Sequence, residues 1–243
     1  EEPTSAPEAN PVELPPTEAP IPDTFGHIVF VSNRDGQMSL YKTSTDGVEQ
    51  LRLTTSSSED INPVTSPDGT HVAFVSTVDS NMDIYVLDLN TLNITRVTDA
   101  AGKDAAPSWS PNGQQLAFES FRDGNLEIYV TNIDGSNPIR LTNDPAGDSN
   151  PIWSPTANEI AFVSNRFGNS DILVLTPNGS VSTITTNSAP DSAPAWSPDG
   201  SVLSFSRPDA VGIVDVEKAR LSTLQNITPL NTHGDWAWTP NIA

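Results

Sequence analysis

The chain has 243 residues, no cysteine, and 31 acidic against 11 basic residues, which gives a formal net charge of −20 at pH 7. This length supports a sizeable hydrophobic core, and the missing thiols exclude disulfide bonds. The negative field excludes nucleic acid as a partner and favours basic partners or metal cations. Because no apolar run approaches the roughly 18 to 20 residues of a membrane span, we expect no membrane insertion.

The first segment, residues 1–24, differs from the rest of the chain. Residues 1–23 contain seven prolines, six acids and no basic residue. Such a segment has nothing to bury and repels itself, so it predicts an extended, disordered linker ahead of a folded domain at residues 25–243. The linker suits a tether that holds the domain away from a membrane or wall, and a simple disordered end is the alternative.

A motif built on Trp-Ser-Pro recurs through the folded domain. Its copies occupy residues 63–67, 107–111, 151–155, 194–198 and 236–240. The final prolines of successive copies lie 44, 44, 43 and 42 residues apart. This period fits a four-stranded propeller blade and is too long for a leucine-rich repeat.

Three short β-type runs follow each motif. Turns with glycine, such as Asp68-Gly69, Asn112-Gly113 and Asp199-Gly200, supply the positive φ of a tight hairpin. They precede the second-strand runs 72–75, 116–118, 160–163 and 202–205. The third strands are expected at 84–86, 128–130, 172–174 and 213–214, and the fourth strands end at 97–98, 141–142, 184–185 and 227–228. No segment keeps a helical period over ten residues, so almost no helix is expected.

The two ends of the domain carry complementary parts of one unit. Residues 28–31, 40–41 and 51–54 read as second, third and fourth strands, whereas 236–240 reads as a first strand alone. Joining them completes a fifth blade. The sequence therefore predicts an all-β, five-bladed β-propeller of four-stranded antiparallel blades, closed by pairing of the C-terminal strand with the three N-terminal strands.

The repeat consensus resembles that of TolB-type propellers over residues 27–240. It consists of a Pro-x-Trp-Ser-Pro-Asp-Gly step, an Ile-Ala-Phe-x-Ser strand, an Asn-Arg-Asp-Gly loop, an Ile-Tyr-Val strand and a closing Leu-Thr. The resemblance implies a bacterial periplasmic, cell-surface or secreted propeller, monomeric, that acts by binding another protein. TolB itself has six blades after a small N-terminal domain, whereas this chain has five units after a linker. The resemblance therefore supports the expected fold more strongly than it supports binding to the partners of TolB.

Four aspartates stand at one repeat position, seven residues before the final proline of each motif. They are Asp60, Asp104, Asp148 and Asp191, and His233 takes the place in the fifth unit. If the first strands line a channel, these side chains form a ring at its mouth, where Ca²⁺ or Mg²⁺ would find oxygen ligands. We favour the alternative of a structural role, in which each Asp accepts hydrogen bonds from a loop or from an Arg of a neighbouring blade, and no cofactor is bound.

Repetition also argues against an enzyme. A general acid and a general base need different environments, and residues repeated in every blade share one. We therefore expect no catalytic residue. A carbohydrate-active propeller, either a glycosidase or a lectin-like module, is the alternative. It would use the acidic mouth or the repeated tryptophans, which we expect instead in the core between blades.

The loops between second and third strands make the better binding hypothesis, because loops on a rigid scaffold commonly carry recognition. We expect a protein or peptide ligand on this face. Phe121 and Phe167 are apolar residues in polar turns, and tucking back onto the blade is the alternative for both. The candidate rim residues are Arg34, Phe121, Arg122, Arg166, Phe167 and His233.

Overall fold

The structure is a computed structural model that describes residues 26–176, 179–186, 188–208 and 210–215. These residues form eighteen strands and one short 3-10 turn, Val78–Ser80, so the described chain is all-β as expected. No helix among them is long and apolar enough to cross a membrane. The predicted linker, the rim candidate His233 and the predicted closing strand at 236–240 lie outside the described residues.

The strands make five antiparallel sheets in chain order, which we number sheet 1 to sheet 5. Sheet 1 contains β1 (His27–Ser32), β2 (Ser39–Ser44) and β3 (Gln50–Arg52). Sheet 2 contains β4 (Asp60–Thr65), β5 (His71–Ser76), β6 (Asp83–Asp88) and β7 (Ile94–Arg96). Sheet 3 contains β8 (Asp104–Trp109), β9 (Gln115–Ser120), β10 (Glu127–Asn132) and β11 (Ile139–Arg140). Sheet 4 contains β12 (Asp148–Trp153), β13 (Ile160–Ser164), β14 (Asp171–Leu175) and β15 (Val181–Thr183), and sheet 5 contains β16 (Ser192–Trp196), β17 (Val202–Arg207) and β18 (Ala210–Asp215).

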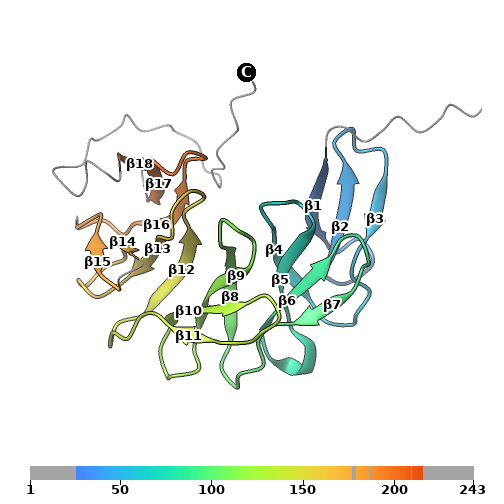
Figure 1. Ribbon diagram of the computed structural model, residues 1–243, viewed down its shortest axis with the longest axis horizontal. Helices are drawn as coiled ribbons and strands as arrows, with labels where there is room; N and C mark the ends of the chain where they lie inside the picture. The colour runs from blue at the N-terminus through green and yellow to red at the C-terminus, as the bar shows by residue number, and fades with distance from the viewer. Residues whose placement is uncertain (1–25, 177–178, 187, 209, 216–243) are drawn as a thin grey trace, which may run out of the picture.

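The sheets follow one another around an arc, with sheet 1 and sheet 5 at its two ends (Figure 1). Each sheet contacts the next one along the chain, and the first strands β4, β8, β12 and β16 contact one another in series. These four strands therefore form the inner wall of the arc. The arrangement is that of consecutive propeller blades.

The sequence explains the hairpins within each sheet. Gly69 and Gly113 have φ of +70° and +67°, the backbone conformation expected of the glycine in these turns. The repeated Leu-Thr pair, however, lies just beyond the short fourth strand and not inside it. In sheet 2 the amides of Val97 and Thr98 both donate to the carbonyl of Ile84, and the Thr98 hydroxyl accepts the Ile84 N–H at 2.9 Å. This threonine thus ends the fourth strand by holding it to the third.

The core lies between sheets, as the repeated aromatic positions predict. One phenylalanine from each second strand of sheets 2 to 5 is at most 2% exposed: Phe74, Phe118, Phe162 and Phe205. Trp109 is buried, and its indole N–H donates to the carbonyl of Val64 on the inner strand of the preceding sheet at 2.9 Å. Trp196 makes the same bond to Ile152 at 3.0 Å. Trp109 and Trp196 therefore join neighbouring sheets through their indole N–H groups, whereas the indole nitrogen of Trp153 is buried without such a bond to a described residue.

Candidate functional site

The inner strands share a backbone distortion at their centres. Pairing with the second strand shifts register in the middle of β4, β8, β12 and β16, which marks a β-bulge in each. The residue before the proline has a left-handed backbone in every case: Asn62 (φ 52°), Ala106 (φ 50°), Asn150 (φ 50°) and Ala193 (φ 48°). A bulge bends the strand and redirects its side chains, so each inner strand turns these residues towards the centre of the arc.

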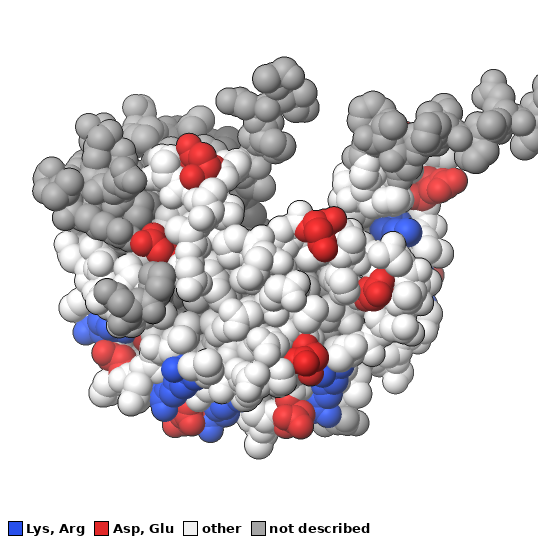
Figure 2. All heavy atoms as spheres, in the orientation of Figure 1, with Lys and Arg blue, Asp and Glu red and all other residues white. Residues whose placement is uncertain are grey.

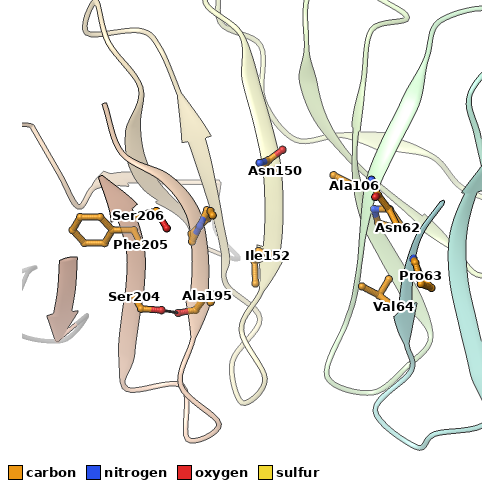
Figure 3. Close-up of a pocket in the computed structure, with 13 residues that line it drawn as sticks. Asn62, Pro63, Val64, Ala106, Asn150, Ile152, Ala195, Ser204, Phe205 and Ser206 are labelled. Atoms are coloured by element: carbon orange, nitrogen blue, oxygen red, sulfur yellow. Dashed lines mark hydrogen bonds between the residues drawn. The ribbon is translucent and has the colours of Figure 1, made fainter. Parts of the chain in front are cut away.

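The four bulges surround a cavity of about 370 Å³. Its lining residues are Asn62, Pro63, Val64, Ala106, Pro107, Asn150, Ile152, Ala193, Pro194, Ala195, Ser204, Phe205 and Ser206. Figure 3 shows Asn150 and Ile152 projecting from one strand, with Asn62, Val64 and Ala106 on the other side of the opening. Among these described residues none is ionisable, so the wall combines apolar surface with the neutral amides of Asn62 and Asn150.

Glu119 breaks the repeat beside this cavity. Its counterparts in sheets 2 and 4 are Val75 and Val163, as the pairing of the strands shows. The half-buried Glu119 carboxylate accepts the backbone N–H of Asn150 from the next sheet at 2.8 Å. This bond supports the left-handed bulge of β12, so Glu119 positions one of the two cavity amides.

The four aspartates of the predicted acidic ring are all buried. Asp104 pairs with Arg122 at 2.9 Å, Asp148 with Arg166 at 2.9 Å, and Asp191 with Arg207 at 2.6 Å. Asp60 accepts instead from the Ser76 hydroxyl at 2.5 Å. The described residues contain no group of three or more His, Cys, Asp or Glu side chains placed to hold a metal ion, so the structure does not bring the four aspartates together.

Two of the three rim arginines, Arg122 and Arg166, take part in these same pairs. The Arg122 guanidinium also lies over the rings of Phe118 and Tyr129, at 5.5 and 4.5 Å from the ring centres. Arg34 stacks in the same way on Phe30 and Tyr41, but it is exposed and bonds to Ser32 and Gln50. Arg122 and Arg166 are therefore committed to the scaffold, whereas Arg34 lies at the surface.

Phe121 and Phe167 do not tuck back onto their sheets. Phe121 is 50% exposed and Phe167 is 57% exposed. The backbone of the Phe121 loop rests on Gly102, where an added Cβ would come within 2.4 Å of the Arg122 nitrogen. The connection before β8 therefore packs against the backbone of this loop, and the ring of Phe121 lies at the surface.

A second row of buried acids escaped the sequence analysis. Asp83 and Glu127 begin the third strands of sheets 2 and 3, and both are fully buried. They pair with Arg96 and Arg140 of the fourth strands at 2.7 and 2.8 Å. The signal was present in sheets 2 and 3 as an acid before Ile-Tyr-Val and an arginine two residues before the closing threonine. On the face in Figure 2, blue and red atoms lie next to one another along the lower edge, so exposed groups of both charges alternate there.

A family model described as the TolB beta propeller domain matches residues 23–243. The solved TolB structure from Acinetobacter baumannii is similar over 88% of this chain, with 28% identity and a TM-score of 0.73. The chain spans 55% of that protein's length. A putative TolB from Agrobacterium tumefaciens is 26% identical over 72% of this chain and 68% of its own, with a TM-score of 0.60.

More distant neighbours share the fold alone. An oligogalacturonate lyase from Vibrio parahaemolyticus has 17% identity and a TM-score of 0.65, over 81% of this chain and 61% of its own. No curated protein matches the sequence. The propeller architecture thus occurs in enzymes as well as in TolB.

Proposed function

The chain belongs to the TolB beta propeller domain family, and we propose that it is a non-enzymatic, monomeric propeller of the bacterial cell envelope that binds an extended peptide segment of another protein at its axial cavity. We further propose that the ring is five-bladed and closes through residues 236–240. The linker at residues 1–24 would tether the propeller within the envelope.

The cavity between the bulged strands carries this proposal. Its volume of about 370 Å³ suits a few side chains of an extended segment, and its walls are mostly apolar, with the polar side chains of Asn62, Asn150, Ser204 and Ser206 among them. The side-chain amides of Asn62 and Asn150 each offer both donors and an acceptor, which is what a peptide backbone requires. Glu119 holds the Asn150 backbone in place. Pre-formed polar groups in an apolar cleft are typical of binding sites.

The alternative of a carbohydrate-active enzyme requires catalytic carboxyl groups in the site. A glycosidase needs two carboxyl groups with different environments on either side of the bond that is cleaved. The described lining residues of the cavity contain no carboxyl group, which supports binding as the proposed role. Incubation with polygalacturonate and an assay for reducing ends or unsaturated products discriminates the two readings. Turnover by the purified chain would contradict a non-enzymatic role.

The experiment that tests peptide binding uses alanine, because alanine already occupies two of the four bulges. A peptide selected from a displayed random library on the full chain is labelled, and its affinity is measured by fluorescence anisotropy. Asn62 and Asn150 are both exposed in the free chain, and we expect Asn62→Ala and Asn150→Ala each to weaken binding about tenfold, since each removes a hydrogen bond to the bound peptide worth about 1.4 kcal/mol. Asn90→Ala, in an exposed turn, is the control. Unchanged affinity in both cavity variants would show that the peptide binds elsewhere.

A further inference from the structure

In three sheets the fourth-strand arginine makes the same set of hydrogen bonds, which we call the arginine cradle. It lies at the joint, the region where one sheet packs against the next. In sheets 1, 2 and 3 the fourth-strand arginine donates through Nε to a threonine carbonyl two residues ahead, at 2.7, 2.9 and 2.7 Å. Its terminal nitrogen reaches the first residue of the third strand: Ser39 at 3.0 Å, Asp83 at 2.7 Å and Glu127 at 2.8 Å. The arginines are Arg52, Arg96 and Arg140.

Sheet 4 keeps the cradle but lacks the arginine. Thr183 takes the place of Arg140, because it pairs with Leu173 as Arg140 pairs with Tyr129. Thr185 still accepts the third-strand N–H at 2.9 Å and donates to Asp171 Oδ1 at 3.3 Å. Asp171 is fully buried, and its Oδ2 has no hydrogen-bond partner among the residues that the structure describes. The carbonyl of Thr185 likewise receives no hydrogen bond from a described residue.

The charges at this joint are unbalanced. Between sheets 3 and 4 two acids, Glu127 and Asp148, are paired with two arginines. Between sheets 4 and 5 the described residues supply one arginine, Arg207, for the two acids Asp171 and Asp191. Arg207 bonds to Asp191. Burial, and then the charge of Asp191, raise the pKa of Asp171. Asp104 also has one oxygen without a partner, but its other oxygen is paired with an arginine. Asp171 is therefore the one acid of this set that has no cation of its own in the described part of the chain.

The surface around Thr183 is apolar where the other sheets are charged. In sheet 3 Asp123 accepts the hydroxyl of Tyr129 and pairs with Arg140 at 3.2 Å. Phe167 replaces this aspartate in sheet 4 and is 57% exposed. Val181 is two residues from Thr183, on the same face of β15, and is 39% exposed. The aspartate, tyrosine and arginine of sheet 3 have thus been replaced together by apolar or small side chains.

We propose that this site, the Thr183 notch formed by Asp171, Thr183 and the Thr185 carbonyl, docks an arginine side chain of a partner protein. The incoming guanidinium would donate to Asp171 and to Thr185, as the chain's own arginines do in sheets 1 to 3. An apolar residue beside it in the partner would cover Phe167 and Val181. A guanidinium fits better than an ammonium group, because its planar fork serves both acceptors at once. The net charge of −20 favours a basic partner. This site lies apart from the axial cavity and stands independently of the function proposed for it.

Asp171 is fully buried, so side chains above it must shift before a guanidinium reaches it. Thr183→Arg tests whether the notch accepts one. The new side chain is expected to fill the notch and raise the urea midpoint of unfolding, whereas Thr95→Arg, an exposed position on β7, leaves the midpoint unchanged. A midpoint lowered or unchanged by Thr183→Arg means that the notch cannot hold a guanidinium, and the proposal is wrong.

Binding is tested with the acetylated and amidated tripeptide Leu-Arg-Leu, titrated into the ¹⁵N-labelled full chain. Changes in NMR chemical shift are expected for the backbone amides of Phe167, Thr183 and Thr185. The same peptide with the neutral citrulline in place of arginine should produce none of these changes. Thr183→Arg and Asp171→Asn should weaken the arginine peptide at least tenfold, and Thr95→Arg should not. Equal binding of the citrulline peptide, no shift at millimolar peptide, or shifts confined to the axial cavity would each overturn the proposal.

Discussion

Replacement of Arg166 by methionine should destabilise the protein strongly, because it leaves a buried carboxylate without its cation. Asp148 is fully buried and accepts two hydrogen bonds from Arg166, at 3.1 and 2.9 Å. Methionine keeps an apolar contact with the Phe162 ring, over which the guanidinium lies at 5.8 Å. Breaking a buried pair typically costs about 3 to 5 kcal/mol, and the 19% exposure of the Arg166 side chain places the expected loss near about 3 kcal/mol at pH 7.

The loss should depend on pH in a defined direction. Burial raises the pKa of Asp148, and Arg166 is one of the groups that oppose this rise. Without Arg166 the pKa of the folded state rises further above that of the unfolded chain. A carboxyl group raised in this way contributes stability below the unfolded pKa, and that stability is lost as pH rises through the folded pKa. The cost of Arg166→Met should therefore be small near pH 4 and large at pH 7.

Urea unfolding followed by tryptophan fluorescence at both pH values measures this difference. The double variant Arg166→Met with Asp148→Asn should recover at least half of the loss at pH 7, because no charge remains buried. Arg34→Met is the matched control at the same repeat position. Arg34 is exposed and bonds to neutral groups, so its loss should stay below about 1 kcal/mol. A loss equal at both pH values, or as large for Arg34→Met, would refute the charge argument.

Three further changes test other parts of the scaffold. Trp109→Phe removes the indole bond to the preceding sheet and should cost about 1 to 2 kcal/mol in urea unfolding; no change would mean that this bond does not join the sheets. Gly200→Ala should cost about 1 kcal/mol more than Gly69→Ala, because both glycines have φ of +70° but only at Gly200 would the new Cβ meet the Thr156 hydroxyl, at 2.1 Å. Hydrogen bonds from Ser66 and from Thr70 lower the pKa of Asp68 to about 2, so the stability it contributes should persist above about pH 4 and vanish as pH falls through 2. An NMR titration of this carboxyl with an ordinary midpoint near 4 would contradict that.

The repeat period made much of the scaffold predictable. One motif at fixed spacing identified the second and third strands, the glycine turns and the buried tryptophans. The partner of Asp104 was predicted wrongly in one respect: an arginine of a neighbouring blade was expected, whereas Arg122 follows β9 of the same sheet. Asp191 was harder, since its partner Arg207 precedes a shorter loop and does not align by simple counting.

The binding surface was less visible in the sequence. Nothing in the residue types at Ala106 and Ala193 predicts a left-handed backbone, because alanine disfavours it; the bulge is imposed by the strand pairing. The cavity these residues line therefore appears only in three dimensions. The outer row of Asp83 and Glu127 was missed because its arginines stand on the fourth strand, outside the repeated loop positions.

The buried ion pairs group the strands of this chain across sheet boundaries. Each group contains the third and fourth strands of one sheet and the first strand of the next. Glu127, Arg140 and Asp148 belong to one such joint, although they come from two sheets. A chain divided for fragment complementation at residues 99–103 would separate the Asp83 and Arg96 pair from Asp104 and Arg122. Division within residues 45–49, where Val48 is 79% exposed, separates Arg52 from Ser39 and Asp35 but keeps the joints between sheets 2 and 3 and between sheets 3 and 4 inside one fragment. Split reporters built on this propeller should therefore be cut inside a sheet.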